Sequence, residues 1–288
     1  MELAVQIGLN AVIAGAIYAL VALGFNLIYS TARFFDVGYG ALAVVGGYTM
    51  LYVYKTLELP FALAIVLAVT FAGALGWVIE RFVYRPLRSQ KASPTVLLVA
   101  SIGVLTVVQA TVAILFTSEF KTLSRDVGAT RVFEIFGGVI TEVQVIILFV
   151  ALAIMSTLGL VLKYTLFGKA IRAIADDEEV ARIVGIPSRR LIGIVFFIGS
   201  AIGAVAGIAV GFDTGLQPTV GLALLLGGVI AAIIGGVGNI WGGVAGAFLL
   251  AIIENVGVWT FSGEWKSTVA FAVLILVLLF KPRGLFEK

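Results

Sequence analysis

The sequence predicts an all-α polytopic membrane protein with about eight or nine transmembrane or re-entrant helices. Of its 288 residues, 61% are hydrophobic and only 12% are charged, whereas soluble domains carry about 25% charged residues. Apolar runs recur along the whole chain at about 20 residues, the length that a helix needs to cross a bilayer. We therefore expect residues 1–288 to form a single transmembrane domain in contact with lipid.

The first apolar run covers residues 3–29 and is long enough to span. Ala11, Gly15 and Ala19 are spaced by four residues, so they form a small-residue face that lets another helix approach closely. Asn26, near the end of this run, is the first polar residue expected to face protein rather than lipid. It is a candidate for lining a translocation path.

A polar break at residues 30–40 precedes an apolar stretch that is too short for a regular span. Residues 36–54 are expected to form a broken helix, or a re-entrant segment followed by a span. Irregular backbone at membrane depth needs cover from protein or from a water-filled cavity. Asp36 and Tyr39 are therefore candidates for lining a path, although Tyr39 can equally be an interfacial anchor.

Three more spans are expected in the middle of the chain, at residues 61–79, 95–116 and 143–162. A compact basic loop over residues 80–91 joins the first two, and a mixed-charge loop over residues 117–141 joins the second pair.

The next span, residues 191–212, carries glycine at every fourth position. That spacing places the glycines on one continuous stripe of the helix, which favours close packing against a neighbouring helix. The four glycines are Gly199, Gly203, Gly207 and Gly211.

The last third of the chain is rich in glycine breaks. Asp213 begins a break that is followed by three apolar segments at residues 222–237, 244–259 and 267–280, of which the first spans or re-enters. Acidic residues at membrane depth are functional by default, so Asp213 is a further candidate for the path. An interfacial or helix-capping role is the alternative for this residue.

Basic residues predict the orientation of the chain. The segments 30–36, 80–93, 163–190 and 281–288 hold 14 of the 19 Lys and Arg residues, and strict alternation through nine segments places them on one side. By the positive-inside rule that side is cytoplasmic. We therefore expect a cytoplasmic C-terminus and an extracytoplasmic N-terminus in the inner membrane.

The longest polar interruption, residues 166–190, has the features of a defined helix. Asp176 and Glu179 have the spacing of a capping box, and Gly185 followed by Ile186 and Pro187 is a helix stop. Val180, Ile183 and Val184 share one face of the expected two-turn helix. Such a short helix is not stable alone in water, so we expect it to dock on another protein. A loop that only fixes the topology is the alternative.

We expect the residues of this helix and its caps to couple the chain to a partner protein. They are Asp176, Asp177, Glu179, Val180, Ala181, Ile183, Val184 and Gly185.

The chain lacks the groups that common enzyme and metal sites require. It has no cysteine and no histidine, so thiolate and imidazole ligands and the commonest general base are absent. It has no phosphate-binding loop, because Gly168–Lys169 is followed by Ala170 and lacks the upstream glycine. We expect no catalytic residue, cofactor, metal or nucleic acid. Transport would then be passive, ion-coupled or driven by a partner.

Several motifs resemble those of one transporter family. They are IYALVALGFNLIYS at residues 17–30, ERFVYRPLR at 80–88, GKAIRAIADDEEVARIVGI at 168–186, FFIGSAIGAVAGIAVG at 196–211, GGVGNIWGGVAGAFLLAIIEN at 235–255 and KPRGLF at 281–286. Together they resemble the membrane permease subunits of bacterial and archaeal ABC importers for branched-chain and other hydrophobic amino acids. Within the loop, Glu179-Val180-Ala181 and Gly185 resemble the wider importer motif E-A-A-x-x-x-G.

This resemblance implies a set of partners. A second, homologous permease subunit would complete the path, as a heterodimer of this chain and a related one. Two cytoplasmic ATP-binding subunits would receive the loop, about residues 164–190, and an extracytoplasmic solute-binding protein would deliver the substrate.

One stretch departs from the family pattern. Family members often read Asn-Phe-Ala-His-Gly where this chain has Asp36-Val37-Gly38-Tyr39-Gly40. The same architecture could therefore carry another small solute, such as other amino acids, urea or an amide. An ion-coupled secondary carrier is a third hypothesis, and a membrane enzyme is the weakest.

Overall fold

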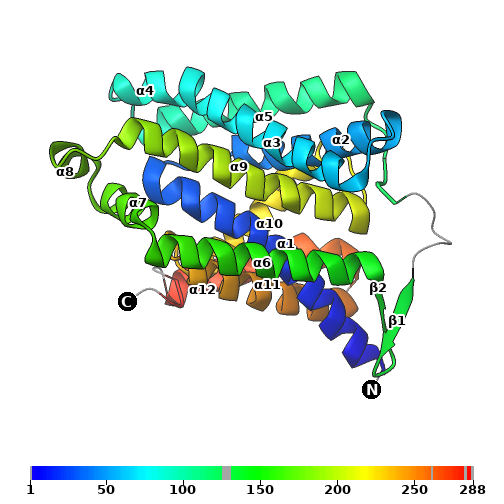
Figure 1. The fold of residues 1–288 in the computed structure, drawn as a ribbon. Coiled ribbons are helices and arrows are strands. Elements are labelled where there is room, and N and C mark those ends of the chain that lie inside the picture. The colour runs from blue at the N-terminus through cyan, green and yellow to red at the C-terminus, as the bar shows by residue number, and fades with distance from the viewer. Residues whose placement is uncertain (1, 125–130, 261, 282–283, 287–288) are drawn as a thin grey trace.

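A computed structural model describes residues 2–124, 131–260, 262–281 and 284–286 as a bundle of membrane-length helices. Seven of the described helices are long and apolar enough to cross a bilayer, and two shorter helices pack among them. The prediction of an all-α membrane fold with about eight or nine spanning or re-entrant helices is confirmed. Figure 1 shows these helices lying roughly side by side.

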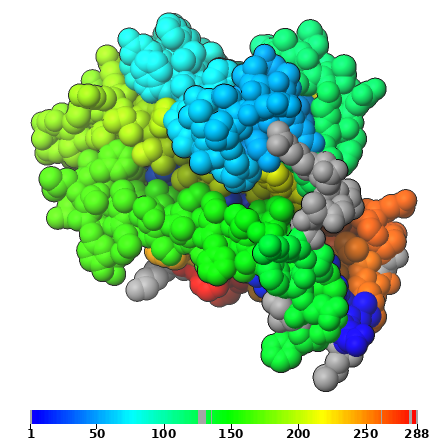
Figure 2. All heavy atoms as spheres, turned by 45° about the vertical axis from the view of Figure 1, so that its right-hand side comes forward, coloured from blue at the N-terminus to red at the C-terminus, as the bar shows by residue number. Residues whose placement is uncertain are grey.

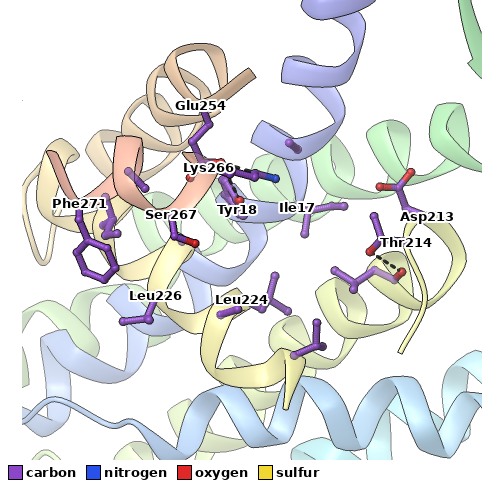
Figure 3. Close-up of a pocket in the computed structure, with 17 residues that line it drawn as sticks. Ile17, Tyr18, Asp213, Thr214, Leu224, Leu226, Glu254, Lys266, Ser267 and Phe271 are labelled. Carbon is purple, nitrogen blue, oxygen red and sulfur yellow. Dashed lines mark hydrogen bonds and ion pairs between the residues drawn. The ribbon is translucent and has the colours of Figure 1, made fainter. Parts of the chain in front are cut away.

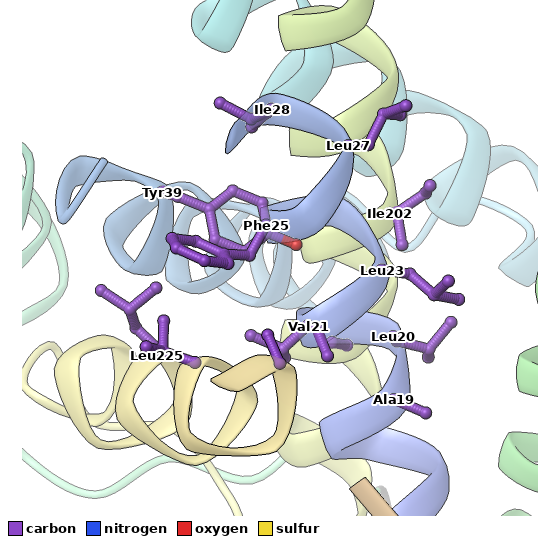
Figure 4. Close-up of a cluster of buried hydrophobic side chains, with 14 of the residues drawn as sticks. Ala19, Leu20, Val21, Leu23, Phe25, Leu27, Ile28, Tyr39, Ile202 and Leu225 are labelled. Atoms are coloured by element: carbon purple, nitrogen blue, oxygen red, sulfur yellow. The ribbon is translucent and has the colours of Figure 1, made fainter. Parts of the chain in front are cut away.

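Two helices form the centre of the bundle. The first, α1 (Glu2–Ala32), packs against α9 (Ser188–Asp213) and against α11 (Ile240–Thr260). Both α1 and α9 are largely buried along their membrane length. Their side chains contribute to one large apolar core, part of which is drawn in Figure 4, with Leu23, Phe25 and Ile202 among its members. Helices that are apolar on all sides are expected at the centre of such a bundle.

The remaining long helices enclose these two and expose much of their apolar surface. They are α3 (Phe61–Ile79), α5 (Pro94–Phe116), α6 (Glu142–Tyr164) and α12 (Lys266–Phe280). Apolar side chains that face outward on a helix of this length are the expected contact with lipid tails.

The broken segment after α1 is a helix that starts inside the bundle. The chain leaves α1 at Ala32, runs without regular structure to Val37, and continues as α2 (Gly38–Leu51) and a π-helical turn (Tyr52–Thr56). Nearly all residues of α2 are buried. The irregular backbone is therefore covered by protein, as the physics of the bilayer requires.

The predicted basic loop at residues 80–91 is wrong for most of its length. Instead α3 continues through a π-helical turn (Glu80–Tyr84) into α4 (Arg85–Ser89). The helix continues because Glu80 is buried and bonded to two arginines one and two turns later. This extension carries the chain beyond the apolar span to its basic end (Figure 1).

A small β-hairpin lies within the predicted mixed-charge loop. Strand β1 (Val132–Ile135) pairs antiparallel with β2 (Gly138–Thr141). The side chain of Gln6, in α1, bonds to the backbone N–H and carbonyl of Val139 and so ties the hairpin to the first helix. Figure 2 shows the hairpin protruding beside the N-terminal residues.

The last third contains α10 (Val220–Gly235) and α11, joined by a tight turn. Gly236 and Gly238 in this turn have φ values of 104° and 89°, a backbone region that glycine adopts without a steric penalty. A short 3₁₀ turn (Gly263–Trp265) leads into α12. The described residues thus form seven helices of membrane length and two shorter ones, α2 and α10.

The four basic segments lie at one end of the bundle. In Figure 1 that end carries α4, α7 (Leu166–Asp176), α8 (Glu178–Ile183) and the C-terminus, and the N-terminus and hairpin lie at the other. The Arg33 guanidinium donates a hydrogen bond to the Ala175 carbonyl, which joins two of these segments directly.

Candidate functional site

The short helix α8 begins at a well-formed cap. The Asp177 carboxylate accepts hydrogen bonds from the backbone N–H groups of Glu179 and Val180, at 2.8 and 3.0 Å. This satisfies two of the N–H groups that a helix start leaves without partners. The predicted cap at Asp176, with Glu179 as its box partner, is therefore wrong by one residue. Asp176 instead completes the last turn of α7, whose buried apolar residues carry that helix one residue further.

The helix α8 ends at Gly185, as the sequence predicts. The Ile186 N–H bonds to the Ala181 carbonyl and the Gly185 N–H bonds to the Arg182 carbonyl. This pair of bonds is a Schellman motif, and Gly185 has the positive φ, 88°, that the motif needs. Both ends of this six-residue helix are thus fixed by local hydrogen bonds.

The apolar face of α8 points away from the bundle. Val180, Ile183 and Val184 are 54%, 82% and 69% exposed, whereas Ala181, on the opposite face, is buried. A surface helix normally turns its apolar face inward. Three exposed branched side chains thus form an apolar patch on one short helix, and contiguous exposed apolar patches are typical of interaction sites.

The helix α7 holds α8 against the bundle. Its residues Ile171 and Ile174 are buried in the main core, and Arg172 donates to the Leu162 carbonyl at the end of α6. These contacts connect α7 to α6 and, through Arg33, to the segment that follows α1.

A charged cluster beside α8 was not predicted. The buried Glu80 carboxylate bonds to the guanidinium groups of Arg85 and Arg88, at 3.0 and 2.6 Å. Arg85 also donates to the Arg189 carbonyl at the start of α9. A cavity of about 240 Å³ separates these arginines from Glu179 and Arg182 of α8. The sequence does carry a signal for this cluster, because an acid stands five residues before one arginine and eight before the other. The prediction of a loop for this segment did not use that spacing.

The four predicted path residues do not meet in one cavity of the described chain. Asn26 is buried and binds the α10–α11 turn, since it accepts from the Gly238 N–H and donates to the Asn239 carbonyl. Asp36 is buried and accepts a hydrogen bond of 2.7 Å from the Tyr84 hydroxyl. These two residues connect helix ends to neighbouring segments.

Tyr39 lies at the crossing of three helices. Its side chain is fully buried, and its ring and hydroxyl fill the space left by Gly24 in α1 and Gly203 in α9. The hydroxyl has no hydrogen-bond partner among the described residues. The position is therefore inside the bundle and not at its interface.

Asp213 does line a cavity. It is the last residue of α9, is half-buried, and accepts a hydrogen bond of 2.9 Å from the Gln144 side chain. The cavity of about 290 Å³ is formed by α1, α9, α10, α11 and α12. Figure 3 shows Tyr18, Glu254 and Lys266 on the side opposite Asp213. None of these three residues was among the path residues that the sequence predicted.

Three of the four glycines of α9 face two other helices, α1 and α2. A side chain at Gly199 would meet Ile28 of α1, and one at Gly203 would meet Tyr39. At Gly207 it would meet the backbone of Ala43 in α2, and Gly211 faces Leu123. The stripe thus lies where α9 comes closest to its neighbours.

Among the described residues no group of three or more His, Cys, Asp or Glu side chains could hold a metal ion. The candidate sites are thus the capped helix α8 and the cavity beside Asp213. Residues 7–278 match the protein family described as branched-chain amino acid transport system permease component. The chain belongs to this family.

Permease proteins from two bacteria resemble this family member over almost its full length. The high-affinity branched-chain amino acid transport system permease protein LivH of Escherichia coli K12 is 33% identical over 300 residues, which cover 97% of this chain and 94% of LivH. The permease protein BraD of Pseudomonas aeruginosa PAO1 is 31% identical over 291 residues, again with 97% and 94% covered. This chain is thus a transport permease and not an enzyme.

A solved structure has a similar fold. PsaBC from Streptococcus pneumoniae, in complex with Fab, aligns with 95% of this permease and 91% of its own chain, at a TM-score of 0.54 and 14% identity. At that identity the likeness concerns the fold alone.

Proposed function

We propose that this chain is a transmembrane subunit of an ATP-driven importer for branched-chain and other hydrophobic amino acids. Membership of the permease family supports the substrate class. The exposed apolar face of α8, on a helix capped at both ends, carries the argument for a driven partner. In this proposal residues 1–288 form one transmembrane domain, and the loop of about residues 164–190 couples it to ATP hydrolysis.

The coupling residues act mechanically in this proposal. Asp177 and Gly185 fix the two ends of α8, and Val180, Ile183 and Val184 enter a groove of an ATP-binding subunit. Ala181 packs against the bundle, and Asp176 and Glu179 add negative charge at the start of the helix. The complete importer also contains two ATP-binding subunits, a homologous second permease subunit and a solute-binding protein.

The orientation follows from the same proposal. The end of the bundle with α4, α7, α8 and the C-terminus is cytoplasmic, and the N-terminus is extracytoplasmic. The excess of Lys and Arg in the segments at that end supports this orientation.

The path residues take different parts in this scheme. Asp213 faces a cavity near the extracytoplasmic end and contacts solute directly. Asn26, Asp36 and Tyr39 lie inside the bundle. In this proposal they are polar groups between helices, and they line the path only when the helices rearrange during alternating access.

The test is partner capture by purification. The chain is expressed together with its partner permease and ATP-binding subunits and purified through a tag on this chain alone. We expect the ATP-binding subunits to co-elute with the unaltered chain. Val180→Asp combined with Ile183→Asp places two charges on the docking face, so the ATP-binding subunits are lost while the chain still inserts in the membrane.

A matched control adds the same charge elsewhere on the loop. Lys169→Asp lies on the exposed side of α7, and we expect it to retain the ATP-binding subunits. If the double aspartate variant still captures these subunits and drives uptake at the unaltered rate, α8 is not the coupling helix. If the chain purifies alone and vesicles take up solute under an ion gradient, it is a secondary carrier instead.

A further inference from the structure

The cavity near Asp213 combines an apolar wall with charges of both signs. Its apolar lining comes from four helices, α1, α9, α10 and α12, and includes Ala14, Ile17, Leu224, Leu226, Ile230 and Phe271. Its charged lining is limited to Asp213, Glu254 and Lys266, and the hydroxyls of Tyr18, Thr214 and Ser267 also face it. An apolar pocket with a few convergent polar groups is the usual form of a small-molecule site.

Asp213 is a carboxylate that no described cation neutralises. Among the described residues it has no salt bridge and only one hydrogen bond, from the neutral Gln144 amide. It also ends α9, and the C-terminus of a helix disfavours negative charge. A half-buried carboxylate in this position would be stabilised by a positively charged ligand.

The other side of the cavity carries a cation that is only partly neutralised. Lys266 Nζ is 3.8 Å from the Glu254 carboxylate, whose nearer partner is the Tyr18 hydroxyl at 2.9 Å. The Lys266 side chain is 45% exposed, and long lysine side chains turn readily. Figure 3 shows the Lys266 amine and the Asp213 carboxylate on opposite sides of the same open space.

We propose that this cavity is a binding site within the permease for a zwitterionic amino acid with an apolar side chain. Lys266 binds the α-carboxylate, Asp213 binds the α-ammonium group, and the side chain lies on the apolar wall of Ile17, Leu224 and Ile230. The assignment deepens the proposed function and rests on it for the direction of transport. In this proposal the membrane subunit itself binds solutes selectively, after any selection by a solute-binding protein.

The size of the cavity is adequate for such a ligand. Its volume of about 290 Å³ is several times the share of one water molecule in the liquid, about 30 Å³. Burial of an aliphatic side chain in such a wall contributes about 1.5–3 kcal/mol. The two charged contacts then select for solutes that carry both groups.

The absence of cysteine from this chain makes a direct test available. Ser267→Cys and Thr214→Cys each place one thiol in the cavity lining. The complete importer carrying either variant is reacted with a charged, membrane-impermeant thiol reagent, without ATP and without binding protein. L-Leucine at ten times its Kd should slow the labelling of an occluded thiol about elevenfold, by mass action.

Charge-deleted analogues and variants identify the contacts. Isocaproate lacks the ammonium group of leucine and isoamylamine lacks its carboxylate, so neither should protect the thiol. Adding Asp213→Asn or Lys266→Gln should abolish protection by leucine. Glu264→Gln, an exposed acid two residues before Lys266, should leave protection intact and is the matched control.

The outcomes separate this site from the proposed function. Leucine protection that survives both Asp213→Asn and Lys266→Gln, or equal protection by the analogues, overturns the assignment. Thiols that never react, or react without protection by leucine, overturn it too. If the unaltered importer still takes up leucine with ATP in that case, the proposed function stands without this site. If leucine protects but ATP drives no uptake, the site stands and the proposed function fails.

Discussion

The close approach of α2 and α9 gives a quantitative prediction for Gly207→Ala. A Cβ at this position of α9 would lie 2.6 Å from the carbonyl carbon of Ala43 in α2, and closer still to its oxygen. Real Cβ atoms essentially never come within 3.0 Å of another heavy atom. Because the obstacle is backbone and not a flexible side chain, α2 and α9 must move apart along their contact.

The expected cost follows from this separation. Overpacking of a tight interior typically costs about 1–3 kcal/mol, and a gap of 0.5–1 Å also removes about a quarter to a half of the dispersion attraction across the contact. The gain in helix propensity from Gly to Ala, at most about 1 kcal/mol, offsets part of this. We expect a net destabilisation of about 2 kcal/mol.

Gly103→Ala is the matched control, since no atom lies within 4 Å of a Cβ at that position of α5. Both variants are purified in the same detergent, and their thermal unfolding is followed by loss of the monodisperse elution peak. At about 2–4 °C per kcal/mol for a chain of this size class, the midpoint of Gly207→Ala should lie about 4–8 °C below that of the unaltered chain. The midpoint of Gly103→Ala should not fall. Equal midpoints for the two variants would refute the close approach of α2 and α9.

Two further predictions concern the basic end of the bundle. Glu80→Gln leaves the Arg85 and Arg88 guanidinium groups without their buried anion, and since both arginines are partly exposed we expect a loss of about 2 kcal/mol rather than the 3–5 typical of full burial. Thermal unfolding beside the exposed control Glu58→Gln measures it, and equal midpoints would contradict it. Asp177→Ala removes the α8 cap and should cost about 1 kcal/mol locally, with faster amide exchange at Glu179 and Val180 and slower ATP-driven uptake. Asp177→Ser should restore both, and unchanged exchange in the alanine variant would contradict the capping role.

Local sequence signals predicted the capped helix α8 well, apart from its first residue. Gly185 and the face of Val180, Ile183 and Val184 could be identified because caps and helical periodicity depend only on near neighbours. The choice between Asp176 and Asp177 could not, because both are good caps. The burial of Ile171 and Ile174 in the distant core decides where α7 ends.

Long-range contacts explain the larger differences. Residues 80–89 read as a charged loop, yet they are helical because Glu80 finds two arginines inside the bundle. The hairpin at residues 132–141 has local signals, since β-branched and aromatic residues flank Gly137 and Gly138, but its contact with Gln6, more than 130 residues away, has none. Pairings at such separations leave no trace in local composition.

The sequence by itself determined the membrane class of this protein, the approximate positions of its spans, the basic end and the glycine stripe. Each of these depends on composition or on a short period along the chain. Only the tertiary structure decided which polar residues share a cavity. Tyr18, Asp213, Glu254 and Lys266 come from four helices, and their meeting depends on how those helices pack. Whether charged side chains from separate helices lie together is decided by that packing, which no single segment encodes.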